Sequence, residues 1–184
     1  VNPIPELQDV KKNIQGSDTY TQDQLQKLDF FRSRAQRVFE KVEELIPPGK
    51  MLDIGCAIGT ELVVARERGW EGTGIELSES SVRIALQNQL HVLSKPLEDI
   101  QFPENHFDLI TLNHVLEHVS EPRRLFQEIK RVLKDRGFLF ISIPNVSAWK
   151  RYLQGTGYYW AFHDDHFVHY SMMTLSRLLH NYGF

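Results

Sequence analysis

The sequence predicts an α/β fold in which a doubly wound, mainly parallel sheet carries helices on both faces. Short apolar runs alternate along the chain with segments whose apolar residues recur at helical spacing. Several of these runs are continuously apolar, as expected for strands that are buried on both faces. The 184 residues, 41% hydrophobic and 24% charged, suffice for one domain with a substantial core.

A helical cap is expected before the sheet. Thr21 to Gln24 has the spacing of a capping box, and Pro47 ends the helix that follows it. Between them one face is apolar, formed by Leu25, Leu28, Phe31, Ala35, Val38, Val42 and Leu45. We therefore expect residues 1–46 to form a lead-in and a cap helix, and residues 47–184 to form the core of the same single domain.

Strands and helices are expected to alternate from residue 50 onward. The expected strands are residues 50–54, 72–76, 90–94, 107–112 and 138–143. The expected helices are residues 59–68, 78–89, 120–133 and 172–181, with Ser78 and Ser120 as capping residues and Leu133 on the inner face of the third helix. We predict the strand order 3-2-1-4-5.

A candidate ligand loop follows the first strand. Asp53 ends that strand, and Gly55-Cys56-Ala57-Ile58-Gly59 leads into a helix. Ligands of doubly wound sheets bind beyond the carboxyl ends of the strands, where small residues let the backbone approach them. Glycine is common in any turn of this kind, but Glu76 then ends the second strand, where a carboxylate can accept both hydroxyls of a ribose. The pair predicts a nucleoside site.

A dinucleotide-binding dehydrogenase is the competing interpretation of this loop. Its G-x-G-x-x-G pattern places a pyrophosphate at the start of a helix. Here the pattern reads Gly55-x-Ala57-x-x-Thr60, and the second glycine is Gly59. The dehydrogenase pattern is absent, so a ligand without phosphate is favoured.

Five segments in series resemble the motifs of class I S-adenosylmethionine-dependent methyltransferases, in particular small-molecule enzymes like the O-methyltransferases of ubiquinone biosynthesis. They are residues 52–59, 74–78, 97–103, 107–119 and 131–145. The resemblance implies a Rossmann-like fold and S-adenosyl-L-methionine as cofactor. Members of this family continue with two further strands, so we expect the final strands to be missing and the edge of the fifth strand to be exposed.

The resemblance also implies cofactor contacts. The loop from Gly55 would lie against the methionine part, Glu76 would bind the ribose, and Leu77 and Glu98 would lie near adenine. The full implied set is Asp53, Gly55, Ala57, Gly59, Glu76, Leu77, Leu97, Glu98 and Asn113. Asn113 is expected near the amino acid end. Ala57 stands where the family usually has glycine.

Histidines are the candidate catalytic residues on the acceptor side. Methyl transfer is an in-line displacement, and a base is needed only when the acceptor must lose a proton. We predict His118 and His166 in this role. If His114, Glu117 and His118 share one helical turn, they could instead hold a divalent metal with His163 or His166, or simply make structural hydrogen bonds. We expect no metal.

The sequence thus predicts methyl transfer to a small-molecule acceptor at an oxygen. A non-catalytic cofactor-binding or regulatory domain is an alternative, and a nucleic-acid methyltransferase is a weaker one because the net charge is only −3. The longest apolar stretch, residues 137–144, is far short of the ~20 residues of a membrane helix. We expect no membrane partner and a cytoplasmic location; the oligomeric state does not follow from the sequence.

Overall fold

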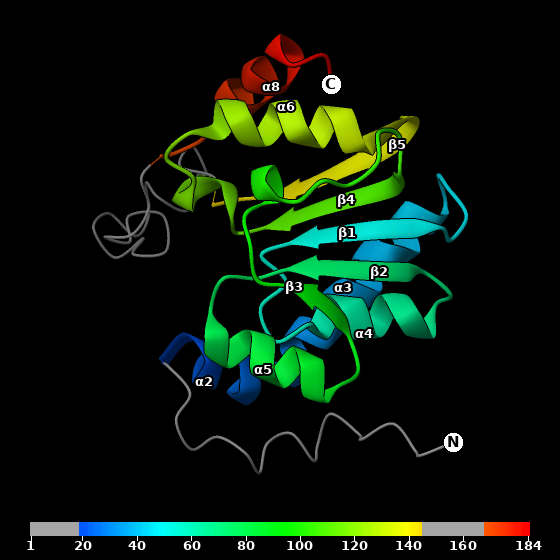
Figure 1. Ribbon diagram of the computed structural model, residues 1–184, viewed down its shortest axis with the longest axis vertical. Coiled ribbons are helices and arrows are strands. Elements are labelled where there is room, and N and C mark those ends of the chain that lie inside the picture. Colours follow the sequence, from blue (N-terminus) through cyan, green and yellow to red (C-terminus); the bar gives the residue numbers. More distant parts are fainter. Residues whose placement is uncertain (1–18, 145–167) are drawn as a thin grey trace, which may run out of the picture.

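The computed structural model describes residues 19–144 and 168–184. Its centre is a five-stranded sheet in the order β3-β2-β1-β4-β5, and every neighbouring pair is parallel (Figure 1). The strands are β1 (Lys50–Ile54), β2 (Glu71–Ile75), β3 (His91–Leu93), β4 (Phe107–Asn113) and β5 (Leu133–Ser142). The predicted fold class and strand order are confirmed.

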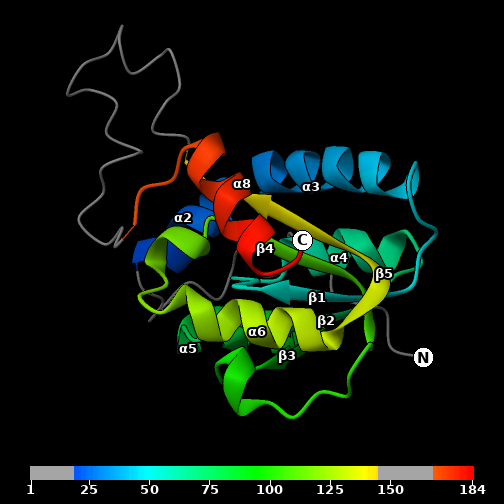
Figure 2. The ribbon, with the colours of Figure 1, turned by 90° about the horizontal axis from the view of Figure 1, so that it is seen from above.

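Helices cover both faces of the sheet. They are α2 (Thr19–Gln26), α3 (Leu28–Glu43), α4 (Thr60–Glu67), α5 (Glu79–Gln87), α6 (Pro122–Val132) and α8 (Met172–Asn181), with short 3-10 helices η2 (Leu97–Asp99) and η3 (Leu116–His118). Figure 2 shows α3 and α6 on opposite sides of the sheet. Alternate strand residues serve the two faces: Leu52 packs with the α6 side, and Met51 packs with the α3 side.

The predicted cap helix is two helices, because Lys27 leaves the helical conformation between α2 and α3 (φ −100°, ψ 20°). The capping role predicted for Thr21 is wrong. Thr21 lies inside α2, fully buried, and its hydroxyl is 2.8 Å from the hydroxyls of both Ser80 and Ser81 on α5. A buried hydroxyl needs a hydrogen-bond partner, and here the partners lie across a helix–helix contact.

The boundary between α6 and β5 also differs from the prediction. Leu133 was placed on the helix, but it begins β5 and pairs with Phe107, five residues before the predicted start of that strand. The register shifts between Phe107 and Leu109, which accommodates the additional residues as a bulge. Ser120 is not the capping residue either: Glu121 holds that position without a side-chain cap, and Pro122 opens the helix as expected.

The other described elements begin and end within two residues of their predicted positions. β3 and β5 form the two edges of the described sheet, so β5 is an edge strand as predicted. No helix in residues 19–144 and 168–184 combines the length and the apolar character that a membrane span requires.

Candidate functional site

The turn after β1 is built from left-handed backbone. Positive φ angles occur at Gly55 (72°), Ala57 (49°) and Gly59 (84°) before α4 begins. A Cβ on Gly55 would lie 2.3 Å from Cγ2 of Val115, and one on Gly59 would lie 2.2 Å from Cδ1 of Leu90. The conformation favours glycine at both positions, and an added Cβ would also have to displace a side-chain methyl group. Ala57 adopts the left-handed region at a cost of about 1–2 kcal/mol.

Glu76 faces this turn. Its Oε2 accepts a hydrogen bond of 2.8 Å from the backbone N–H of Ala57, and its Oε1 accepts from the backbone N–H groups of Leu77 and Ser78, also at 2.8 Å. A carboxylate offers about four acceptor positions. Three are in use, so one ribose hydroxyl can bind directly, and a second hydroxyl can bind by replacing a backbone donor.

Two further carboxylates lie around the same turn. Asp53 is 2% exposed and accepts a hydrogen bond of 2.7 Å from the hydroxyl of Thr111. Burial raises the pKa of Asp53, and the negative charges of Glu61 and Glu76 raise it further. Burial also raises the pKa of Glu61, against the opposing charge of Arg34. Acids gathered in this way disfavour a phosphate and favour a cationic ligand.

Asn113 lies where β4 ends, next to β1. Its Nδ2 donates to both carboxylate oxygens of Glu61 at 2.7 Å, and its Oδ1 accepts from Arg34 of α3 at 2.8 Å. Sequence reasoning missed Glu61 and Arg34. An acid in the first turn of a helix is typical of helix starts, and an arginine on a helix is usually solvated, so neither residue carries a distinctive sequence signal.

The residues expected near adenine differ in how far their side chains are exposed to a ligand. Leu77, next to Glu76, is 61% exposed, so a ligand could cover its apolar side chain. Leu97 is 1% exposed and packs into the core on the α6 side, which leaves only its backbone for a ligand. Glu98 is exposed on η2.

On the acceptor side the predicted shared helical turn is wrong. His114 follows β4 with a left-handed φ of 54°, and η3 includes only Glu117 and His118 of the three residues. His114 Nδ1 nevertheless lies 3.2 Å from Oε1 of Glu117. The Glu117 side chain is 2% exposed, and its Oε2 has no hydrogen-bond partner among residues 19–144 and 168–184, whereas the His114 side chain is 48% exposed.

A metal site is not assembled by this part of the chain. Among residues 19–144 and 168–184, no group of three histidine, cysteine or acidic side chains is placed to hold a metal ion. His163 and His166, the other predicted contributors, lie outside the described residues. The metal alternative that involves them therefore remains a sequence-based hypothesis.

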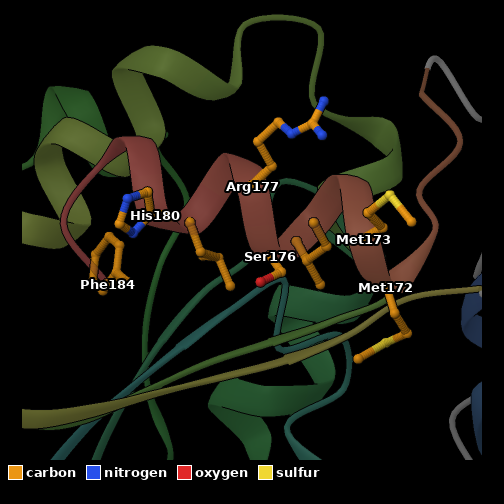
Figure 3. A pocket seen from close by; sticks show the side chains of 8 residues that line it. Met172, Met173, Ser176, Arg177, His180 and Phe184 are labelled. Carbon is orange, nitrogen blue, oxygen red and sulfur yellow. The ribbon is translucent and has the colours of Figure 1, made fainter.

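A hollow along α8 is a separate feature, shown in Figure 3. Its lining includes the methionines Met172 and Met173, which are 67% and 72% exposed, and Arg177 points away from Met172 across the helix. The described residues that line it include no aspartate or glutamate that could bind a ribose. The candidate cofactor site is therefore the carboxyl edge of β1, β2 and β4, not this hollow.

Residues 26–184 match the family described as a methyltransferase domain. A ubiquinone biosynthesis O-methyltransferase of Glaesserella parasuis is 35% identical over 110 residues, which cover 54% of this chain and 47% of that protein. The chain thus spans about half the length of the curated relatives that it matches.

Two solved structures are similar in fold. A SAM-dependent methyltransferase from Archaeoglobus fulgidus has a TM-score of 0.75 at 20% identity, covering 91% of this chain and 75% of that one. The [4+2]-cyclase SpnF has a TM-score of 0.50 at 32% identity, covering 57% and 43%. Because the family match extends over most of the chain, including the turn after β1, Glu76 and Asn113, this protein belongs to the class I S-adenosylmethionine-dependent methyltransferases.

Proposed function

We propose that this chain transfers a methyl group from S-adenosylmethionine to an oxygen of a small-molecule acceptor. The observation that carries the proposal is the 2.8 Å hydrogen bond from the Ala57 N–H to Glu76, which brings the turn and the ribose-binding acid together. The oxygen acceptor is supported by those curated relatives that are described as ubiquinone biosynthesis O-methyltransferases.

The residues present fit this cofactor, which is cationic and lacks phosphate. The backbone of residues 55–59 would hold its methionyl part, Glu76 its ribose, and Leu77 the face of its adenine. Asp53 and Glu61 place two carboxyl groups beside the same turn, and a cationic ligand with a sulfonium and an ammonium group would favour their ionised forms. When bound, the cofactor supplies an electrophilic methyl group on its sulfonium sulfur.

The protein's own contribution is to position the acceptor, exclude water and remove a proton. His118 and His166 are the proposed catalytic residues, acting as the base that takes the proton of an acceptor hydroxyl. His118 lies in η3 directly after the buried Glu117. Glu117 contacts His114, and we propose that this pair holds the segment that presents His118.

Further proposals concern the organisation of the domain, its partners and its location. We propose residues 1–46 as a lead-in and cap and residues 47–184 as the methyltransferase core, with a small-molecule acceptor, no nucleic-acid or membrane partner and a cytoplasmic location. These assignments rest on the near-neutral charge and on the chemistry of the site.

The test combines equilibrium binding with methyl transfer. Calorimetry should detect binding of S-adenosylmethionine, and radiolabelled methyl transfer should be measured over matched hydroxyl and amine acceptors, including phenols, sugars and the corresponding anilines and amino sugars, with an RNA arm. We expect turnover on a hydroxyl compound. Turnover confined to amines would refute the oxygen assignment, and turnover on RNA alone would refute the small-molecule assignment.

A second candidate function is cofactor binding without methyl transfer. It is favoured by one observation: the structurally similar protein that is 32% identical is described as a [4+2]-cyclase, not as a methyltransferase. Tight cofactor binding with no methyl release over the whole acceptor panel would support this candidate.

A further inference from the structure

His114 is held in a fixed place at the carboxyl edge of the sheet, directly after β4. Its φ of 54° is left-handed, which costs a residue other than glycine about 1–2 kcal/mol. Its backbone N–H donates to Ser142 O, at the end of β5, at 2.8 Å. Backbone strain of this kind persists only where the surrounding contacts impose it, and it is common at functional sites. The fold therefore gives up stability to hold His114 at the edge where ligands of doubly wound sheets bind.

The residue after His114 connects this position to the cofactor turn. Cγ2 of Val115 lies where a side chain on Gly55 would begin, so the two residues are in close contact. The His114 side chain is 48% exposed next to them. Methyl transfer requires the acceptor to meet the methyl group of the cofactor in line, so a side chain exposed beside this turn can also contact the acceptor.

Glu117 fixes the orientation and the tautomer of the His114 ring. Its Oε1 lies 3.2 Å from Nδ1 of His114. An ionised carboxylate only accepts hydrogen bonds, so Nδ1 carries a proton and is the donor. The neutral ring is then left with Nε2 as a hydrogen-bond acceptor.

Glu117 is itself fixed by contacts with the segment before α8. Its backbone O accepts a hydrogen bond of 3.2 Å from Val168 N. Burial raises the pKa of the Tyr170 phenol, and the negative charge of Glu117 raises it further, which places the two side chains near each other. A buried carboxylate lowers the stability of the fold unless its partners compensate, and a contact with a half-exposed ring adds little. Orientation of the His114 ring, rather than stability, therefore accounts for an acid at this position.

We propose that His114 selects the acceptor: Nε2 accepts a hydrogen bond from a second donor group, a hydroxyl or an amine, close to the oxygen that is methylated. Glu117 is the positioning residue that keeps the ring proton on Nδ1. The proton of the reacting hydroxyl is assigned above to His118 and His166, so Nε2 of His114 serves a different donor. The substrate class is a small molecule with two neighbouring polar groups, and this assignment rests on the proposed function.

The experiment compares acceptors with and without the second donor. The pairs are salicyl alcohol with ortho-cresol and methyl glucoside with the corresponding deoxy sugar. The kcat/KM of methyl transfer is measured for the wild-type chain and for His114→Asn, with His180→Gln on the exposed end of α8 as control. Asparagine adopts the left-handed region more readily than most residues, and its amide can still donate to Glu117, but it has no atom at the position of Nε2.

The wild-type chain should prefer the member of each pair that has the second donor by roughly three- to ten-fold, the effect of one hydrogen bond. His114→Asn should remove this preference, chiefly through KM, and His180→Gln should retain it. Equal losses on both members of a pair would overturn the assignment, because they would show that His114 only holds η3 in place. A wild-type chain that shows no preference would also overturn it.

Two variants of Glu117 test its positioning role. Glu117→Gln keeps an oxygen that accepts from Nδ1, and it should keep most of the preference. Glu117→Leu has a similar size but no acceptor, and it should lose the preference as His114→Asn does. Equal behaviour of the two variants would overturn the positioning role.

A measurement on the ring itself needs neither an acceptor nor turnover. In nitrogen NMR spectra the His114 ring is identified by its absence from His114→Asn. Under conditions in which the ring is neutral, its proton should lie on Nδ1 in the wild-type chain and be shared between both nitrogens in Glu117→Leu. A proton on Nε2 of the wild-type ring would overturn the inference. Failure of the wild-type chain to methylate any acceptor would instead overturn the proposed function, and the two failures are therefore distinguishable.

Discussion

The cofactor side and the acceptor side of the sheet edge are built differently. At the ends of β1 and β2, hydrogen bonds from backbone N–H groups hold the turn: Gly55 and Cys56 donate to Ile75 O, and Ala57 donates to Glu76. The segment after β4 is held by a contact between side chains. His114, in a left-handed backbone conformation, lies beside the buried carboxylate of Glu117.

We therefore expect the two sides to govern different quantities, the affinity for the cofactor on one side and the rate of methyl transfer on the other. Backbone hydrogen bonds fix a turn whatever the acceptor, which suits a cofactor shared by many enzymes. Side chains that meet after β4 can vary without disturbing that turn, which suits a site that selects an acceptor. Changes on the cofactor side should therefore alter affinity for S-adenosylmethionine, and changes on the acceptor side should alter the rate of methyl transfer.

The largest expected effect is on the acceptor side. His118→Gln should lower turnover by roughly 10²- to 10⁴-fold, the usual contribution of a positioned base, and leave the cofactor dissociation constant unchanged. His166→Gln should act in the same direction. Single-turnover methyl transfer at saturating cofactor measures the effect, with His180→Gln on the exposed end of α8 as control. A comparable loss of cofactor affinity would contradict the separation of the two sides.

The next effect is on the cofactor side. Glu76→Ala removes the acceptor of the Ala57 N–H together with the proposed partner of the ribose, and it should weaken binding of S-adenosylmethionine by about 1–3 kcal/mol. The neighbouring exposed Glu79→Ala is the matched control, since Glu79 lies in the first turn of α5. Calorimetry checks both variants. Unchanged affinity in Glu76→Ala would remove the basis of the proposed nucleoside site.

How much of this could be predicted depends on how far apart the partners lie in the chain. The approach of Glu76 to the turn involves neighbouring strands about twenty residues apart. The pairing of β1 with β4 joins residues much further apart, such as Met51 and Leu109, and it was predicted from the strand order typical of doubly wound sheets. The Arg34–Asn113 bond joins residues 79 apart, and no local pattern announces it. Leu133 was misplaced for the same reason: its apolar side chain would be buried on a helix or on a strand, and pairing with distant Phe107 decides between them.

A third prediction concerns pH. Burial raises the pKa of Asp53 above its ordinary 3.8, so the folded chain binds a proton there more tightly than the unfolded chain does. The stability from this group is fully present below about pH 4 and is lost as the pH rises through the raised pKa. Asp53→Asn should remove this loss from urea unfolding curves measured as the pH rises above about 4.

Asp108→Asn is the control of opposite sign. Burial acts to raise the pKa of Asp108, but hydrogen bonds from Lys134 and the Lys50 N–H prevail and lower it. Its contribution is present above the ordinary pKa and is lost as the pH falls through the lowered one. If the free energy of unfolding changed with pH in the same way for wild type and Asp53→Asn, burial of the Asp53 charge would not destabilise the protein in the absence of ligand.

The smallest expected effect tests the backbone of the turn itself. Ala57 holds a φ of 49°, which costs an L-residue about 1–2 kcal/mol, whereas glycine adopts it freely. Ala57→Gly should therefore stabilise the fold, but only by about 0.5–1 kcal/mol, because the glycine also makes the unfolded chain more flexible.

Thermal unfolding checks the sign, with Ala65→Gly as the contrast. Ala65 is buried within α4, where the same substitution should destabilise by about 1 kcal/mol or more. Cofactor affinity should change little in Ala57→Gly, because the N–H that reaches Glu76 belongs to the backbone and survives the substitution. A large loss of affinity would mean that the Ala57 methyl group contacts the cofactor, and that side chains as well as backbone define the cofactor side.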